Sequence, residues 1–182
     1  DRQMELNLAP PTETSTISAQ RVLVLAPHYD DEVFGCGGLL AELADGGADI
    51  RVLYLTDSSG GVEVIGERDA YAARRLAEAR RGLDHIGVTE HETLSIRDGE
   101  LASSVDTAAE AIRRVIHETG PDLILSVSPC EVTADHRAAF ASLHRALSPM
   151  RGGTELDDTV GGARILLYEV NHPGYPSLLV DV

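Results

Sequence analysis

One histidine and three carboxylates stand together near the start of the chain, in the segment Pro27-His28-Tyr29-Asp30-Asp31-Glu32. They directly follow the apolar run 21–26, which predicts a buried strand. Negative charges this close repel one another unless a cation neutralises them. Imidazole and carboxylate together form a ligand set that suits Zn²⁺. The segment therefore predicts a metal site, although an acidic loop that caps the next helix would also explain Asp31 and Glu32.

A second cluster follows another apolar run, 123–127, and contains Asp135 and His136. Taken alone, a helix capped by Thr133 or Asp135 with a surface histidine would explain it. Both clusters follow predicted strands, however, and parallel sheets bind ligands beyond the carboxyl ends of their strands. Two ligands from the first segment and one from the second leave a fourth zinc position open, which is typical of catalytic zinc. Zinc would lower the pKa of a water in that position to about 7.

Apolar runs and helical periodicity alternate along the chain, which is typical of an α/β protein. The alternation predicts a three-layer, Rossmann-like, mostly parallel sheet with helices on both faces. We expect residues 1–19, which are polar and contain Pro10-Pro11, to form an arm or linker, and residues 20–182 to form one domain. The predicted strands span 21–26, 50–56, 91–96, 123–127, 164–170 and 178–182, and the predicted helices span 33–45, 67–86, 104–118 and 134–147.

Composition narrows the class of partner. The 182 residues carry 30 acidic and 15 basic side chains, a net charge of −15 that disfavours nucleic acid and anionic membranes. A solubility feature or a salt-adapted surface would also explain this charge. No apolar run approaches the roughly 20 residues of a membrane span, and Cys36 and Cys130 form no C-x-x-C pair. We expect a cytoplasmic protein, with self-association into a homo-oligomer left open.

At this point the motifs resemble a known family. The segment 26–32, followed by Gly35-Cys36-Gly37-Gly38, is similar to the A-H-P-D-D-E…G-x-G-G signature of the LmbE-like, or PIG-L, deacetylases. Residues 133–137 resemble the H-P-D-H-R motif of that family, and the resemblance covers residues 21–182. It implies a zinc-dependent hydrolase that removes an acyl group, acetyl in the family, from an N-acyl amino sugar or glycoconjugate.

The resemblance also implies roles for single residues. His28, Asp31 and His136 match the three zinc ligands of the family. Asp30 matches its general base, which takes a proton from the attacking water and returns it to the leaving amine. Tyr29 stands where the family has proline, at a position that holds no ligand.

Three further positions are carried over from the family pattern. Asp135 would hold the geometry of the site, and Arg75 loosely matches an arginine linked to substrate binding. Thr133 replaces a histidine thought to polarise the amide carbonyl, and loss of one such donor typically costs about 10²–10³ in rate. Thr133 itself, the zinc ion, His144 or His172 could supply that function.

Alternative functions remain open from the sequence. Gly35 to Gly38 does not complete a G-x-G-x-x-G nucleotide motif, because Leu40 occupies the last position, and close packing of a helix explains these glycines better. The segment Ser58-Ser59-Gly60-Gly61 predicts a rim loop that contacts a sugar or simply turns. A non-catalytic or weakly active domain that binds sugar or metal within a larger protein is the main alternative, and a nucleotide-binding protein is the third.

Overall fold

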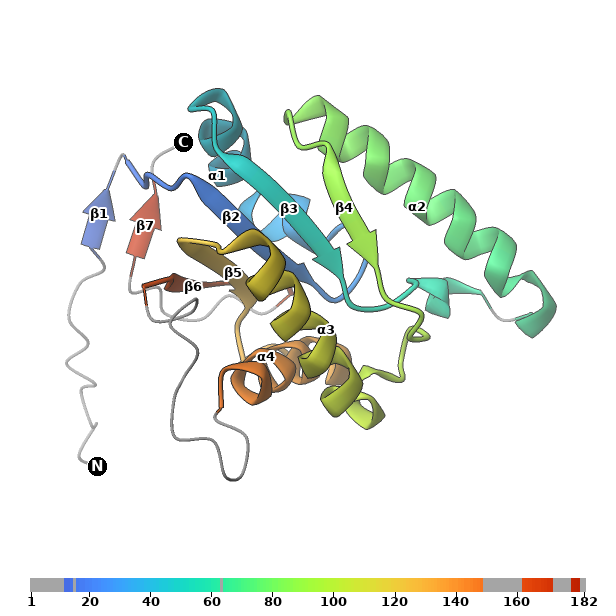
Figure 1. The fold of residues 1–182 in the computed structure, drawn as a ribbon. Coiled ribbons are helices and arrows are strands. Elements are labelled where there is room, and N and C mark those ends of the chain that lie inside the picture. The colour runs from blue at the N-terminus through green and yellow to red at the C-terminus, as the bar shows by residue number, and fades with distance from the viewer. Residues whose placement is uncertain (1–11, 15, 63, 149–161, 172–177, 181–182) are drawn as a thin grey trace, which may run out of the picture.

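The computed structural model of the chain describes residues 12–14, 16–62, 64–148, 162–171 and 178–180, in which strands and helices alternate (Figure 1). The strands are β1 (Thr12–Thr14), β2 (Arg21–Ala26), β3 (Asp49–Tyr54), β4 (Glu90–Thr93), β5 (Leu123–Val127), β6 (Arg164–Tyr168) and β7 (Leu178–Val180). The helices are α1 (Asp31–Asp45), α2 (Arg68–His85), α3 (Val105–Thr119) and α4 (Ala134–Leu147), with short 3₁₀ turns η1 (Ser59–Gly61), η2 (Ile65–Glu67) and η3 (Leu101–Ser103).

Five parallel strands form the central sheet, in the order β4-β3-β2-β5-β6. The chain runs outward from β2 through β3 to β4, then crosses to β5 on the other side of β2 and continues to β6. Val22 of β2 therefore lies opposite both Ile50 of β3 and Leu123 of β5. This reversal makes the carboxyl ends of β2 and β5 the switch point at which such sheets bind ligands. The predicted α/β, mostly parallel fold is confirmed.

Helices cover both faces of this sheet. Right-handed crossovers put α1 and α2 on one face and α3 and α4 on the other, and Figure 1 shows α3 and α4 together. The Arg113 side chain of α3 donates from Nε to the Ala146 carbonyl of α4 at 3.1 Å. Strands β2 and β5 are buried almost throughout, as expected for central strands covered on both sides.

Several element boundaries differ from the predicted ones. Strand β3 ends at Tyr54, although Leu55 and Thr56 still donate backbone hydrogen bonds to Ala26, the last residue of β2, and to Pro27. Strand β4 ends at Thr93 rather than at residue 96. Strand β1 lies within the predicted arm, where the polar Thr-Glu-Thr sequence predicts none, and pairs in parallel with β7. It gains this regular structure only from its distant partner.

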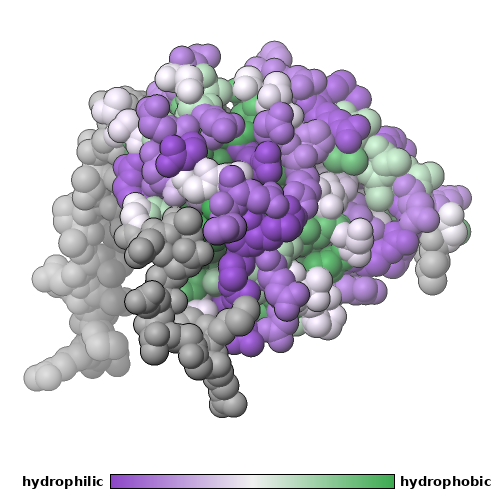
Figure 2. Space-filling view, viewed as in Figure 1, coloured by the Kyte–Doolittle hydropathy of each residue, from purple (hydrophilic) through white to green (hydrophobic). Residues whose placement is uncertain are grey.

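The surface is mainly polar. Figure 2 shows hydrophilic side chains over most of the visible face, with hydrophobic ones in small separate patches, as the acidic composition leads one to expect. Among the described residues, no helix combines the length and the apolar character that a membrane span requires. Cys36 is buried and Cys130 exposed, and both are free thiols.

Close packing explains the first glycine of the 35–38 segment. A Cβ atom added to Gly35 would overlap the ring of Tyr168 at the end of β6, lying 2.7 Å from its Cε2 atom. At Gly37, by contrast, the added atom would come no closer than 3.6 Å to Val33, an ordinary contact. Gly35 thus allows α1 to approach the sheet, which supports the packing interpretation of this segment.

This difference predicts that alanine substitutions at Gly35 and Gly37 change the stability of the fold differently. Gly35→Ala should lower the free energy of unfolding by about 1–3 kcal/mol, because the overpacked methyl group forces side chains or backbone apart. Gly37→Ala, the matched control in the same helix, should be neutral or stabilising by up to about 1 kcal/mol, because alanine favours the helix. Denaturant unfolding followed by circular dichroism measures both, and equal effects would contradict the packing role of Gly35.

Asp122 joins β5 to the start of β2 at the end of the sheet away from the switch point. Its carboxylate accepts hydrogen bonds from the backbone N–H groups of Gln20 and Arg21, each at 2.9 Å. Burial tends to raise the pKa of this carboxyl, but the two backbone donors outweigh it and lower the pKa below its ordinary value. The charged form is therefore stabilised in the folded state.

A carboxyl whose pKa is lower in the folded state stabilises the protein above its unfolded pKa of about 3.9 and loses that contribution as the pH falls through the folded pKa. Asp122→Asn should therefore cost about 1 kcal/mol at pH 7, and the cost should shrink as the pH falls below about 4. Urea unfolding across this pH range measures it, with exposed Asp84→Asn as the control. A cost that stays constant with pH would contradict the role of the Asp122 charge.

Candidate metal centre

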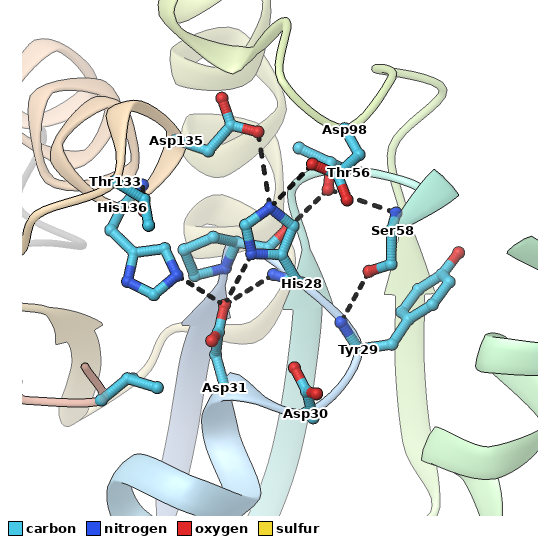
Figure 3. A network of polar contacts seen from close by, with 12 residues as sticks. His28, Tyr29, Asp30, Asp31, Thr56, Ser58, Asp98, Thr133, Asp135 and His136 are labelled. Carbon is cyan, nitrogen blue, oxygen red and sulfur yellow. Dashed lines mark hydrogen bonds and ion pairs between the residues drawn. The ribbon is translucent and has the colours of Figure 1, made fainter. Parts of the chain in front are cut away.

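The predicted metal ligands meet at the switch point (Figure 3). His28 follows β2, and Asp31 is the first residue of α1. His136 lies in the first turn of α4, which follows the loop after β5. Because β2 and β5 are neighbours in the sheet, segments far apart in the sequence place these three side chains together.

The three side chains converge on one carboxylate oxygen. The Nδ1 atom of His28 lies 3.2 Å from Oδ2 of Asp31, and the Nε2 atom of His136 lies 3.3 Å from the same oxygen. Asp31 and His136 are buried, whereas His28 is partly exposed. One ligand atom from each lies within 4.8 Å of the others, so the group could hold a metal ion. The assignment as ligands stays a prediction.

The second ring nitrogen of His28 faces two further carboxylates. Its Nε2 atom lies 3.3 Å from Oδ1 of Asp98 and 3.4 Å from Oδ2 of Asp135. Burial opposes the charged form of His28, but hydrogen bonds to Asp135, Asp31 and Asp98 outweigh burial and raise its pKa to about 12. A carboxylate that accepts the Nε2 hydrogen directs Nδ1 toward a metal, an arrangement common around metal-binding histidines.

Asp135 also connects this histidine to the loop before α3. Its two carboxylate oxygens accept hydrogen bonds from Gly99 N at 2.7 Å and from Leu101 N at 3.2 Å. These contacts support the prediction that Asp135 holds the geometry of the site. The sequence analysis did not identify Asp98. It lies two residues after the predicted strand 91–96, and a position just after a strand is the feature that identified the other two clusters.

Glu131 supports His136 from the opposite side. Its Oε2 atom lies 3.3 Å from Nδ1 of His136, and its Oε1 atom accepts a 2.6 Å hydrogen bond from Val170 N, just after β6. The side chain is buried. Glu131 stands inside the second sequence cluster but received no role there, because its contact with the end of β6 has no local signal.

Two carboxylates of the first segment, Asp31 and Glu32, lie in different environments. Contacts with His136 and His28 outweigh burial and lower the pKa of Asp31 to about 2. Glu32 is fully buried beneath the site, where burial raises its pKa to about 7 although it accepts a 2.6 Å hydrogen bond from the Tyr54 hydroxyl. The expected crowding of charge is thus relieved partly by histidine and partly by turning Glu32 into the core.

Asp30 contacts α2 through its carboxylate. Its Oδ2 atom accepts a 2.6 Å hydrogen bond from Arg75, which also contacts Glu78 at 3.2 Å. The side chain of Asp30 is 39% exposed, so water and a substrate can reach it. Arg75, predicted from the sequence as a substrate contact, here holds the predicted base.

Thr133 caps α4. Its hydroxyl oxygen accepts a hydrogen bond from His136 N at 3.3 Å, as the capping interpretation predicts. The hydroxyl hydrogen takes no part in that bond. His144 is exposed near the other end of α4, eight residues or about 12 Å along the helix axis from His136. It is therefore too far away to contact a substrate amide bound beside His136. His172 lies outside the described residues.

Tyr29, the departure from the family proline, makes a contact that proline cannot. Its backbone N–H donates to the Ser58 hydroxyl at 2.8 Å, and its ring packs edge-on against Tyr54 at 4.9 Å between centroids. Ser58 has φ +50°, the one positive value at a non-glycine residue in the described part of the chain. The hydrogen bond helps to hold this unfavourable backbone conformation in the loop after β3.

Comparison with known proteins shows the family of the chain. Residues 23–147 match the family model described as PIG-L, GlcNAc-PI de-N-acetylase. The diacetylchitobiose deacetylase of Thermococcus kodakarensis is 36% identical over 126 residues, which cover 66% of this chain and 46% of that protein. A probable N-acetyl-alpha-D-glucosaminyl L-malate deacetylase 2 of Bacillus cereus is 30% identical over 139 residues, covering 72% and 62%. The chain thus spans about half to three fifths of the length of these relatives.

A solved structure agrees with the sequence matches. The N,N'-diacetylchitobiose deacetylase of Pyrococcus horikoshii, in complex with an inhibitor, superimposes with a TM-score of 0.70 at 26% identity. The match covers 86% of this chain and 63% of that one. The matched family region includes both sequence clusters that form the candidate metal centre. The chain therefore belongs to the PIG-L family of de-N-acetylases.

Proposed function

We propose that the chain is a zinc-dependent deacetylase that removes an acetyl or related acyl group from an N-acyl amino sugar, free or within a glycoconjugate. The convergence of His28, Asp31 and His136 carries this proposal. The relatives named as deacetylases of N-acetylglucosamine compounds support the substrate class.

The donor spacing fits zinc. Two donors bound to tetrahedral zinc at about 2.05 Å lie about 3.3 Å apart. The two histidine nitrogens lie 3.2 and 3.3 Å from the shared Asp31 oxygen. Two imidazoles and one carboxylate are also a common donor set of hydrolytic zinc, with the fourth position left to water or substrate. His28, Asp31 and His136 would therefore hold the ion, and when bound it supplies a Lewis acid and a water of lowered pKa.

The protein side chains carry the proton transfers in this proposal. Asp30 accepts a proton from the attacking water and then gives it to the departing amine. Arg75 orients Asp30 through the 2.6 Å contact and holds its partly exposed carboxylate in place. In this proposal the Thr133 hydroxyl, whose hydrogen takes no part in capping α4, donates a hydrogen bond to the carbonyl oxygen as negative charge develops there. Asp98 and Asp135 accept the Nε2 hydrogen of His28 and keep its ring in place.

We further propose that residues 20–182 form the catalytic domain and residues 1–19 an arm attached to it. Burial of Ala19 in the core and the hydrogen bonds from Gln20 and Arg21 to Asp122 support a domain that begins near residue 19. A cytoplasmic location stays a prediction, and self-association into a homo-oligomer stays open.

The alternative of a non-catalytic sugar- or metal-binding domain draws on Thr133, which replaces a histidine that the family motif has at this position. Release of free amine from N-acetylglucosamine compounds by the zinc-loaded protein would exclude it. Zinc and sugar binding without any amine release would favour it over the deacetylase.

His136→Ala should abolish tight zinc binding, because it removes one of three protein ligands. His144→Ala, which changes an exposed histidine of the same helix, should leave one zinc ion per chain. Metal analysis after dialysis against a weak chelator measures both. Stoichiometric zinc in His136→Ala would refute the ligand assignment.

Asp30→Asn should retain zinc and the fold while lowering kcat by about 10²–10⁴, the usual contribution of a positioned general base. Asp45→Asn, at the exposed end of α1, is the control and should keep full activity. Release of free amine from N-acetylglucosamine compounds gives kcat, and metal analysis gives zinc content. Near-normal turnover by Asp30→Asn would show that another group is the base.

A further inference from the structure

Tyr29 stands between the candidate ligand His28 and the proposed base Asp30, and only 4% of it is exposed. Its backbone N–H donates a 2.8 Å hydrogen bond to the Ser58 hydroxyl. Proline has no backbone N–H, so a chain with the proline of the family motif could not form this bond. The bond is therefore a property of this chain, and the proposed chemistry gives it no role.

The segment after β2 is held at both ends by β3 and by the residues that follow β3. At one end, the Thr56 hydroxyl donates to the Pro27 carbonyl at 2.8 Å. At the other end, the Tyr54 hydroxyl donates to Glu32 at 2.6 Å. All four residues are buried, and hydrogen bonds are stronger in a buried environment than in water. Both ends of the segment are thus fixed, and two of the candidate ligands lie between them.

The middle of the segment is held at Tyr29. Ser58 accepts the hydrogen bond from its backbone, and the Tyr29 ring packs edge-on against Tyr54, with 4.9 Å between the centroids. Ser58 adopts φ +50° and ψ +33°, a left-handed conformation that glycine tolerates far better than serine. Glycine has no hydroxyl, however, and the need for an acceptor opposite the Tyr29 N–H explains the serine at this position (Figure 3).

The position of Tyr29 decides where two of the ligands lie. His28 and Asp31 are within two residues of it, and His28 N donates a 2.8 Å hydrogen bond to the Asp31 carboxylate. A backbone rotation at Tyr29 would therefore move both side chains relative to His136, which comes from α4. Ligand groups that are held in place before a metal binds lose less conformational entropy on binding, which raises the affinity.

We infer that Tyr29 and Ser58 are positioning residues for the candidate metal ligands. In the family motif the ring of proline restricts the backbone φ angle at this position. In this chain the Ser58 hydroxyl and the packing against Tyr54 fix the backbone instead. The inference rests on the zinc site of the proposed function. It gives Ser58, from a segment that the sequence predicts to contact a sugar or simply turn, a role in supporting the metal site.

The zinc affinity of the full chain, measured by competition with a chromophoric chelator, tests this inference. Ser58→Ala removes the acceptor and should weaken zinc binding at least tenfold, because loss of a group that orients metal ligands typically costs about 10–100-fold in affinity. The matched control is Ser59→Ala. Ser59 is also buried, and its hydroxyl has no hydrogen-bond partner in the described part of the chain. This substitution should change the affinity less than twofold.

Two further variants separate positioning from stability. Ser58→Gly also lacks the hydroxyl, but it adopts the left-handed conformation without strain. Its zinc affinity should fall as far as that of Ser58→Ala, whereas denaturant unfolding of the zinc-free proteins should show the glycine variant to be the more stable. In a Tyr29→Pro background, which has no N–H for the hydroxyl to accept, Ser58→Ala should change the affinity less than twofold.

Equal zinc affinities of Ser58→Ala and Ser59→Ala would overturn the inference. So would losses in the two Ser58 variants that follow their stabilities, or an undiminished loss in the Tyr29→Pro background. If Tyr29→Pro does not fold, the Ser58→Ala and Ser59→Ala pair decides. None of these measurements needs turnover, so a chain that binds zinc but releases no amine would contradict the deacetylase proposal alone. A wild-type chain without tight zinc binding would overturn both.

Discussion

The parallel pairing of β2 with β5 is the constraint on which the rest of the structure depends. It sets side by side two loops that the sequence separates widely, and it does so at the one place where the sheet reverses its winding. The segment after β2 supplies His28 and Asp31, and the helix after β5 supplies His136. Neither loop alone could surround a metal ion, so the candidate site exists only in the folded sheet.

Carboxylates set the orientation and the protonation of both histidines of the site. Each imidazole has one ring nitrogen near the shared Asp31 oxygen and the other near a carboxylate on the far side, Asp98 and Asp135 for His28 and Glu131 for His136. Such partners fix which nitrogen carries a hydrogen and how each ring is turned. The strongly raised pKa of His28 is the electrostatic consequence of this arrangement, and a divalent cation between the rings would take over the role of the proton.

The sequence predicts the architecture and the centre of the site because both have local signals. Apolar runs mark the strands, and His28 and Asp31 stand at the end of one of them. Contacts that join distant segments carry no such signal. Glu131 meets the chain after β6. Asp98 does follow a predicted strand, but its contact with His28, made from the loop after β4, has no signal in the sequence.

Other parts of the structure depend on geometry that residue types do not reveal. The contact of Arg75 with Asp30 requires the exact placement of α2 beside the switch point. Strand β1 forms because β7 offers a partner, not because Thr-Glu-Thr favours a strand. The backbone N–H of Tyr29 matters only because Ser58 lies opposite in a conformation that side chains usually avoid.

The position of the metal is the central claim, and anomalous X-ray scattering at the zinc absorption edge, from crystals of the zinc-loaded chain, tests it most directly. The account predicts one strong peak bonded to Nδ1 of His28, a carboxylate oxygen of Asp31 and Nε2 of His136. The same histidine could instead offer its Nε2 atom to a metal held with Asp98 and Asp135, the second cluster within reach of an ion. A zinc peak at that second position, or no peak at either, would contradict the account.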